Sequence, residues 1–343
     1  MQHVLDIRSL HVTFHTGGGD IPAVRGVNLH VAKGECLGVV GESGSGKSVT
    51  FLSVLRLLGP TGKIETGQVD FLGRDLTRMK PAQLRQVRGG RIAMVFQDPM
   101  SSLNPLLPVG DQVGEMLWAH DKRLSKADRD ARVLELLRMV RIPEAEKRLR
   151  GYPHEFSGGM RQRVMIAMAL ACKPDLLIAD EPTTALDVSI QHQILKLLRA
   201  LQAEMGTGIV FITHDLGVIA QLCSRVIVMY GGLVMEEAPI AELFASPLHP
   251  YTQGLLASIP SIRQDKARRL CPIPGSPPDM SRPPAGCPFA PRCPHVRVIC
   301  TERQAPCLVF SGGARRCACW LHSPDAPADD NPFYGLAQGG ERP

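Results

Sequence analysis

The stretch "CLGVVGESGSGKS", residues 36–48, decides the fold. Its last eight residues, Gly41–Ser48, fit the pattern G-x-x-x-x-G-K-[ST], and the apolar run before them is typical of a buried strand. Glycines in such a loop let successive backbone N–H groups turn inward around phosphate oxygens, and the following helix adds its positive dipole end. The stretch therefore predicts a strand, a phosphate-binding loop and a helix, and with them an ATP or GTP site.

The loop also assigns roles to individual side chains. Lys47 is expected to reach the β- and γ-phosphates, and the Ser48 hydroxyl is expected to ligate Mg²⁺. The candidate nucleotide-binding residues of the loop are Gly41, Ser43, Gly44, Ser45, Gly46, Lys47, Ser48 and Val49.

Short apolar runs and helical patterns alternate along the first two thirds of the chain. The predicted buried strands are "GECLGVVG", "GRIAMVF", "DLLIAD", "GIVFIT" and "RVIVMY". The predicted helices cover Lys47–Leu58, Lys126–Val140, Met160–Cys172 and Val188–Glu204. This alternation predicts an α/β domain of about 235 residues around a mainly parallel sheet.

Polar side chains follow three of the predicted strands, where the carboxyl ends of parallel strands bind ligands. Asp180 and Glu181 end one strand; we expect Asp180 to hold Mg²⁺ through water and Glu181 to act as general base. Gln97 follows a second strand and is expected to sense Mg²⁺ and water. His214 follows a third and is expected to bind the γ-phosphate and orient Glu181, although a histidine at a strand end is more often structural.

A second anion-binding pattern stands far downstream, in "FSGGMRQRV", residues 156–164. Ser157, Gly158 and Gly159 precede a predicted apolar helix, and the N–H groups at such a helix start bind anions. Because the first loop already supplies a phosphate cradle, we expect this second one to face the nucleotide of another subunit. Two such domains packed head to tail would each close the site of the other.

Composition and charge narrow the class of protein. The net charge of +6 is mild for 343 residues, and the basic residues are spread rather than clustered, which favours a solvated surface over a nucleic-acid face. No apolar run approaches the ~18 residues that cross a bilayer. The first residues lack the layout of a signal peptide, so we expect the protein to stay in the cytoplasm.

The composition of the chain changes near its C-terminus. Of the 28 prolines, 14 lie after residue 270, and so do seven of the ten cysteines. This change predicts a separate C-terminal module.

The cysteines of this module suggest a metal site. Cys287, Cys293 and Cys300 are separated by five and six residues, and Cys307, Cys317 and Cys319 follow. Disulfides are disfavoured in a cytosolic ATPase, and the paired C-x₂₋₄-C knuckles of structural zinc sites are missing. An iron–sulfur cluster tolerates varied spacing and needs four thiolates. The alternative to a cluster is that these cysteines are unrelated small residues of a hydrophobic core.

Taken in order, the motifs over residues 1–237 resemble the nucleotide-binding subunit of ABC transporters. The resemblance rests on Gln97, "FSGGM", the Asp180–Glu181 pair, "ALD" at residues 185–187 and His214. It implies that the signature serine and glycines contact the γ-phosphate of the partner, and that Asp187 acts across the interface. Met160 departs from the more usual glutamine. Phe14 is the candidate for stacking on adenine, with core packing as the alternative.

Other stretches resemble the oligopeptide, dipeptide and nickel importer group, in particular the D-type ATPases of dipeptide permeases. They are "QDPMSSLNPLLPVGDQ", "SPLHPYTQGLLASIP", "CPIPGSPPD" and "GCPFAPRC". The resemblance implies a 4Fe–4S cluster in the C-terminal extension. It implies four cluster ligands, Cys287, Cys293, Cys300 and Cys319. Cys317 competes for the fourth position, and Cys307 is a weaker competitor.

The resemblance also implies an organisation and a set of partners. We expect an ABC nucleotide-binding domain at 1–237, with an antiparallel β edge and a helical subdomain at about 98–170, then a small Cys/Pro-rich domain at 238–323 and a disordered tail at 324–343. The expected partners are a second ATP-binding subunit (an F-type paralogue), two transmembrane permease subunits and an extracytoplasmic substrate-binding protein, with no nucleic acid. The protein would lie on the cytoplasmic side of the cytoplasmic membrane.

The expected function is ATP hydrolysis that energises the import of di- or oligopeptides. Nickel import by the same group is an alternative. Two other classes compete: a soluble ABC ATPase acting on nucleic acid or ribosomes, and an iron–sulfur redox protein with incidental nucleotide binding. The first would call for two phosphate loops or a long coiled-coil insertion, which this sequence lacks.

Overall fold

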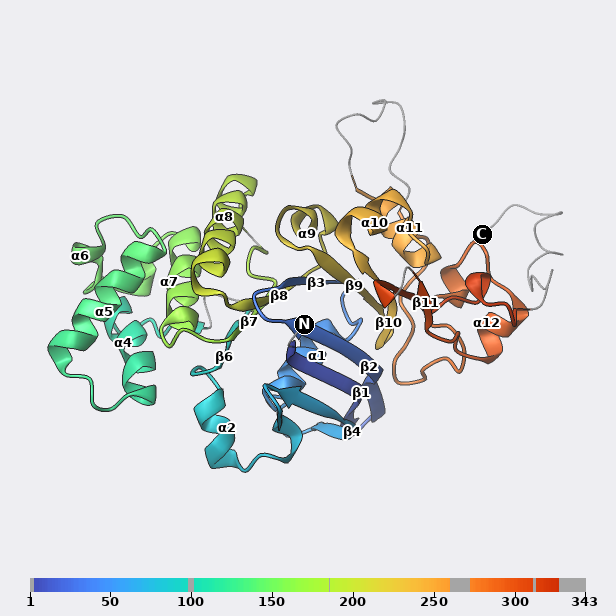
Figure 1. Ribbon diagram of the computed structural model, residues 1–343, viewed down its shortest axis with the longest axis horizontal. Helices are drawn as coiled ribbons and strands as arrows, with labels where there is room; N and C mark the ends of the chain where they lie inside the picture. The colour runs from blue at the N-terminus through green and yellow to red at the C-terminus, as the bar shows by residue number, and fades with distance from the viewer. Residues whose placement is uncertain (1–2, 98–101, 185, 260–271, 311–312, 327–343) are drawn as a thin grey trace. The chain divides into compact units, whose positions relative to one another are not determined.

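The computed structural model describes residues 3–97, 102–184, 186–259, 272–310 and 313–326 (Figure 1). The chain forms two compact units, and each draws on several segments. Unit 1 contains Leu29–Leu37, Val69–Ile212 and the residues before Ile7. Unit 2 contains Ile7–Asn28, Gly38–Gln68 and Thr213–Pro343. Four strands run through both units: β1 (His3–Thr16), β2 (Gly19–Ala32), β3 (Cys36–Val40) and β4 (Gly62–Phe71).

Unit 1 is built on a parallel run of strands. The strands are β6 (Ile92–Val95), β7 (Leu176–Asp180) and β8 (Gly208–Thr213), with Ile92 opposite Leu176 and Leu176 opposite Gly208. Every residue of β7 and β8 is buried, which explains why these strands are continuous apolar runs rather than alternating ones. The short β5 (Arg74–Asp75) pairs with β4 in the antiparallel sense.

Helices make up most of the rest of unit 1. After the 3₁₀ turn Leu76–Arg78 and α2 (Pro81–Val87), the helices α4 (Val109–His120), α5 (Lys126–Met139), α6 (Ala145–Arg148) and α7 (Gly158–Leu170) follow one another. A 3₁₀ turn at Pro153–Glu155 precedes α7, and α4, α5 and α7 pack together. The last helix of the unit is α8 (Val188–Met205).

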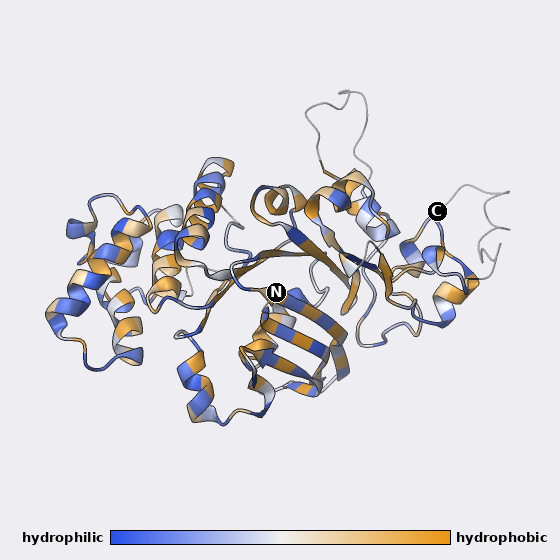
Figure 2. Cartoon of the chain, viewed as in Figure 1, coloured by the Kyte–Doolittle hydropathy of each residue, from blue (hydrophilic) through white to orange (hydrophobic). Residues whose placement is uncertain are grey.

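Unit 2 holds α1 (Lys47–Val54), α9 (Leu216–Leu222) and a run of antiparallel strands. In this run β9 (Arg225–Tyr230) pairs with β10 (Leu233–Pro239), β10 with β12 (Arg315–Cys317), and β12 with β11 (Leu308–Phe310). The C-terminal helices are α10 (Ile240–Ala245), α11 (Pro250–Ala257) and α12 (Val298–Glu302), with 3₁₀ turns at Ala290–Arg292 and Trp320–His322. Strands β1 and β2 alternate apolar and polar residues, as expected when one face of a sheet is buried (Figure 2).

The α/β class is therefore confirmed, and all five predicted strands form. The predicted parallel pairing is present among β6, β7 and β8, whereas β9, β10, β11 and β12 pair in the antiparallel sense. The predicted helices form as well, with ends that differ by a few residues. The largest difference is at α1, which ends at Val54 rather than Leu58 because Arg56 adopts a left-handed φ of 51°. The domain limits at 237 and 323 stay predictions, and the predicted tail lies almost wholly outside the described residues. Among the helices that are described, none is long and apolar enough to span a membrane.

Candidate functional site

The phosphate loop of unit 2 has the backbone that its glycines predict. Gly41, Gly44 and Gly46 all have positive φ, at 154°, 77° and 96°. A Cβ on Gly41 would lie 2.1 Å from the carbonyl oxygen of Met229, and one on Gly46 would lie 2.5 Å from that of Ala23. The first and last glycines of the motif are thus required by close backbone approach as well as by conformation.

Lys47 occupies the inside of this loop. Its Nζ donates to the carbonyl oxygens of Gly41 and Glu42, both at 2.8 Å, and to Ser45 Oγ at 3.3 Å, and the residue is only 5% exposed. Helix α1 begins at Lys47 with Gly46 as N-cap and no side-chain cap, so its first N–H groups face the loop. Ser48 and Val49 lie half-buried in the first turn. The N–H groups at such a helix start can bind phosphate oxygens, and the contact of Lys47 with the phosphates stays a prediction.

The predicted acidic residues belong to unit 1. Glu181 follows β7, and its carboxylate Oε2 accepts hydrogen bonds from Gln97 Nε2 at 3.0 Å and from Thr184 Oγ1 at 2.9 Å. Gln97 and Glu181, predicted from separate strand ends, are thus brought together. Asp180, the last residue of β7, is 7% exposed. Thr184 was not predicted, because a threonine three residues after the acid carries no signal of its own.

The second anion-binding pattern also lies in unit 1 and forms a capped helix start. Ser157 is the N-cap of α7, and its Oγ accepts from the N–H of Met160 at 3.3 Å. Ser157 and Gly158 are exposed, whereas Gly159 is buried and a Cβ on it would lie 2.6 Å from Ile190 Cγ2. Asp187 caps α8 through the N–H of Ile190 at 2.8 Å. The close packing at Gly159 sets the starts of α7 and α8 beside each other.

Two predicted residues remain without a demonstrated role. His214 is exposed just after β8. Phe14 is half-buried on β1, and its ring covers Gly62, where a Cβ would lie 2.9 Å from Phe14 Cε1. This contact gives Phe14 a packing function in unit 2. Its stacking on adenine and the γ-phosphate contact of His214 stay predictions.

Four cysteines of the C-terminal segment line one small cavity in unit 2. Its lining includes all four predicted cluster ligands, Cys287, Cys293, Cys300 and Cys319, together with His249. Burial raises the pKa of Cys287 and of Cys293 to about 12, and that of Cys319 to about 11. These thiols are therefore protonated near neutral pH unless a cation draws off the protons.

The buried His249 side chain adds a polar group to this cavity. Its Nδ1 accepts a hydrogen bond from the N–H of Tyr251 at 3.0 Å, and burial lowers its pKa to about 3. The ring is therefore neutral with its proton on Nε2, and this N–H is buried with no partner among the described residues. A buried donor without an acceptor costs free energy, so it is a sign of a group that fills the cavity when present.

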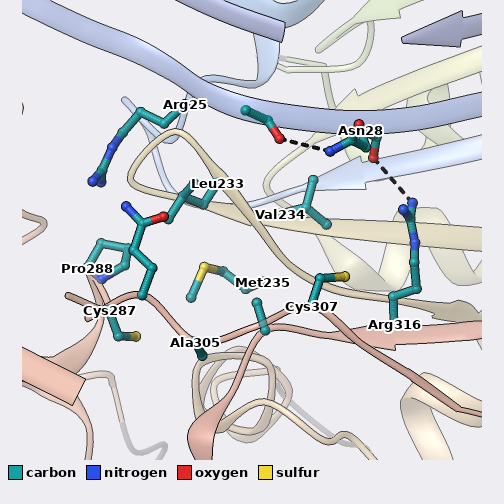
Figure 3. A pocket seen from close by; sticks show the side chains of 13 residues that line it. Arg25, Asn28, Leu233, Val234, Met235, Cys287, Pro288, Ala305, Cys307 and Arg316 are labelled. Carbon is teal, nitrogen blue, oxygen red and sulfur yellow. Dashed lines mark hydrogen bonds between the residues drawn. The ribbon is translucent and has the colours of Figure 1, made fainter. Parts of the chain in front are cut away.

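The two competing cysteines lie elsewhere in the described structure. Cys307 lines a neighbouring cavity of about 160 Å³, which also contains Arg316, Met235 and Cys287 (Figure 3). Cys317 is 1% exposed on β12, opposite Glu236 of β10. Within the described residues, no three His, Cys, Asp or Glu side chains are placed to hold a single metal ion. A single zinc ion would need its thiolates at about 2.3 Å, whereas a cluster binds each thiolate through a different iron.

Comparisons with known proteins agree with this arrangement. A family model described as "ABC transporter" matches residues 24–184, and one described as "Oligopeptide/dipeptide transporter, C-terminal region" matches residues 235–300. The dipeptide transport ATP-binding protein of Bacillus subtilis is 50% identical over 94% of this chain and 95% of its own length. The oligopeptide transport ATP-binding protein of Salmonella typhimurium is 50% identical over 92% of this chain and 93% of its own.

Solved structures show the same fold. A dimeric ATP-binding cassette in a post-hydrolysis state with ADP and Pi is 32% identical, with a TM-score of 0.62 over 69% of this chain and 98% of its own. A Clostridium perfringens subunit of an ABC transporter complex is 29% identical, with a TM-score of 0.61 over 72% and 92%. The chain belongs to the ATP-binding subunits of ABC transporters, a family that hydrolyses ATP, and it carries the C-terminal region of the oligopeptide/dipeptide group.

Proposed function

We propose that this chain energises the import of di- or oligopeptides by binding and hydrolysing ATP on the cytoplasmic face of the cytoplasmic membrane. Support comes from the transport named for its relatives and from the matching C-terminal region. Its partners would be two transmembrane permease subunits, a second ATP-binding subunit and an extracytoplasmic binding protein. The second ATPase would be an F-type paralogue.

The observation that carries the catalytic proposal is the pair of hydrogen bonds received by Glu181. Both donors, Gln97 and Thr184, bond the same oxygen, Oε2, and hold the carboxylate in one place, where it would accept a proton from the attacking water. Loop N–H groups and Lys47 would bind the phosphates, and His214 would contact the γ-phosphate. The oxygen donors Ser48, Gln97 and Asp180 suit Mg²⁺, which would neutralise phosphate charge.

The exposed start of α7 supports a shared active site. Ser157 and Gly158 are at the surface of unit 1, and Asp187 is exposed at the start of α8 beside them. In our proposal Ser157, Gly158 and Gly159 bind the γ-phosphate held by the second ATP-binding subunit, and Asp187 acts across that interface. Each site would then be complete only in the closed pair.

We further propose that Cys287, Cys293, Cys300 and Cys319 hold a 4Fe–4S cluster. The four thiols share one cavity, and the unpartnered N–H of His249 can donate to a sulfur there. Anaerobically purified chain should contain iron and sulfide and show visible absorption. Cys319→Ser should lose the iron, while Cys317→Ser should keep it. Equal iron in both variants would contradict the ligand assignment, and the absence of iron from the wild type would contradict the cluster.

The proposed transport function is tested by purification from detergent-solubilised membranes followed by reconstitution. Co-purification of two permease subunits and a second ATPase is expected, and ATP turnover in vesicles should rise with peptide and the binding protein. Stimulation by Ni²⁺ rather than by peptide would indicate a nickel importer. Recovery of tRNA or ribosomal proteins in place of permease subunits would contradict the transport function.

A further inference from the structure

Glu42, the second residue of the phosphate loop, is held on three sides. Its carbonyl oxygen accepts from Lys47 Nζ at 2.8 Å, as described above. Its own N–H donates to the hydroxyl of Tyr251 at 2.8 Å, and its carboxylate Oε2 accepts from Arg292 Nη1 at 2.7 Å. Two of these three partners come from the C-terminal part of the chain. Tyr251 is 209 residues away from Glu42 along the chain, and Arg292 is 250 residues away.

Arg292 is anchored at every nitrogen of its guanidinium group. Besides Glu42, Nη1 donates to the hydroxyl of Tyr230 at 3.0 Å, Nε donates to Pro274 O at 2.8 Å, and Nη2 donates to Ile273 O at 3.2 Å. The side chain is 6% exposed and that of Glu42 is 24% exposed, so water screens this ion pair weakly. A planar guanidinium fixed in this way holds the Glu42 carboxylate in one place.

Tyr251 is equally constrained. The residue is fully buried, and its ring packs against Tyr230 with centroids 4.6 Å apart and against Phe289 at 5.2 Å. Burial raises the pKa of its hydroxyl far above the ordinary value, so the hydroxyl stays neutral and accepts from the Glu42 N–H. The same C-terminal segment also contributes Pro277, Pro278 and Met280 to a cavity that borders Ser43, Gly44 and Ser45.

We propose that Arg292 and Tyr251 are positioning residues for ATP, which hold the phosphate loop in its binding conformation through Glu42. A loop whose N–H groups already point inward loses less conformational entropy when it binds phosphate, so its affinity is higher. Without these contacts Glu42 and the carbonyl oxygen that accepts from Lys47 gain alternative conformations. The C-terminal extension is in this way a working part of the nucleotide site.

The position of the two residues links this function to the cysteine cavity. Cys293 and His249 both line that cavity. Arg292 directly precedes Cys293, and Tyr251 lies two residues after His249. The contacts with Glu42 thus lie one or two residues of chain away from the cavity wall. The contacts of Arg292 and Tyr251 with Glu42 are present whatever the cavity binds.

The test measures ATP affinity and steady-state turnover of the full-length chain carrying Arg292→Gln, Tyr251→Phe or Glu42→Gln. Arg292→Gln should weaken ATP binding by about tenfold, which corresponds to about 1.4 kcal/mol, and should raise KM while leaving kcat nearly unchanged. Tyr251→Phe, which keeps the buried ring, should weaken binding by about threefold. Arg292→Lys should fall between wild type and Arg292→Gln.

A double variant separates positioning from general damage. If Arg292 acts through Glu42, adding Arg292→Gln to Glu42→Gln should cause no further loss of affinity. Arg282→Gln, an exposed arginine of the same segment, should match the wild type. Unchanged ATP affinity in both Arg292→Gln and Tyr251→Phe, or additive losses in the double variant, would overturn the proposal. Lys47→Ala tests the phosphate loop itself and should abolish ATP binding. If it does so while Arg292→Gln and Tyr251→Phe bind ATP normally, the loop is the nucleotide site but Arg292 and Tyr251 do not position it.

Discussion

Glu181 takes a backbone conformation that a side chain ordinarily avoids. Its φ of 47° lies in the left-handed region, and such strain persists only where neighbouring contacts hold it. Here the N–H of Glu181 donates to Ile212 O at 2.9 Å, and the carboxylate is held by Gln97 and Thr184. Strain of this kind is typical of functional sites, which agrees with the proposed role of Glu181 as general base.

The corresponding prediction concerns Glu181→Gln. An amide has the same shape but cannot take up a proton, so turnover should fall by at least ~100-fold while ATP binding is retained. Phosphate release and nucleotide binding measure the two effects separately. Glu135→Gln, on the exposed face of α5, is the matched control and should keep wild-type activity. Turnover that survives Glu181→Gln would mean that another group is the base.

Some of these residue-level features could be predicted from sequence and others could not. The phosphate loop and the acid pair depend on local pattern, so Gly41, Lys47 and Glu181 could be named without a structure. The bond between Arg292 and Glu42 joins residues 250 positions apart, and no local signal marks it. Cys317 and Cys319 are nearly equivalent in sequence; only the fold around β12 shows which of them lines the cavity.

At the scale of elements, a buried ion pair ties β10 to β12. Glu236 is fully buried on β10, and its Oε1 accepts from Arg315 Nη2 at 3.1 Å. The same carboxylate accepts from the N–H groups of Leu248 and His249, both at 2.9 Å, just before α11. One side chain thus joins two strands and the start of a helix.

We expect Glu236→Gln to destabilise the fold by about 3 kcal/mol, because Arg315 loses its buried counter-charge. Chemical unfolding of the full chain measures the change. Glu242 provides the control: its Oε2 lies 3.8 Å from Arg315 Nε, but its side chain is 43% exposed. Glu242→Gln should change stability by less than about 0.5 kcal/mol. Equal effects of the two substitutions would contradict the assigned role of burial.

Asp187 has a structural and a proposed functional role, and two substitutions separate them. It caps the 18-residue helix α8, so Asp187→Ala should cost about 1 kcal/mol of stability. Asp187→Asn keeps an oxygen for the cap and should preserve stability. If Asp187 also acts across a subunit interface, Asp187→Asn should still lower turnover. Wild-type turnover in Asp187→Asn would show that Asp187 caps the helix and has no role across an interface. Thermal unfolding and phosphate release are the two measurements.

At the scale of the whole molecule, two compact units divide the predicted catalytic residues. Unit 2 holds the phosphate loop and the C-terminal segment, and unit 1 holds Glu181 and the exposed start of α7. The fold class followed from the alternation of strands and helices, since each buried strand is an apolar run with its own boundaries. The shared assembly stays a proposal, and it depends on the presence of two predicted anion-binding patterns, Gly41–Ser48 and Ser157–Gly159, in a chain with one predicted nucleotide site.

The most direct test of the proposed shared active site is the ATP turnover per chain over a dilution series, for the chain mixed with the second ATP-binding subunit that we propose as its partner. We predict that turnover per chain falls on dilution, as the closed pair dissociates, and that Ser157→Ala lowers the plateau at high concentration. Turnover per chain that stays constant down to the lowest concentration and is unaffected by Ser157→Ala would show that one subunit suffices, and would contradict the account.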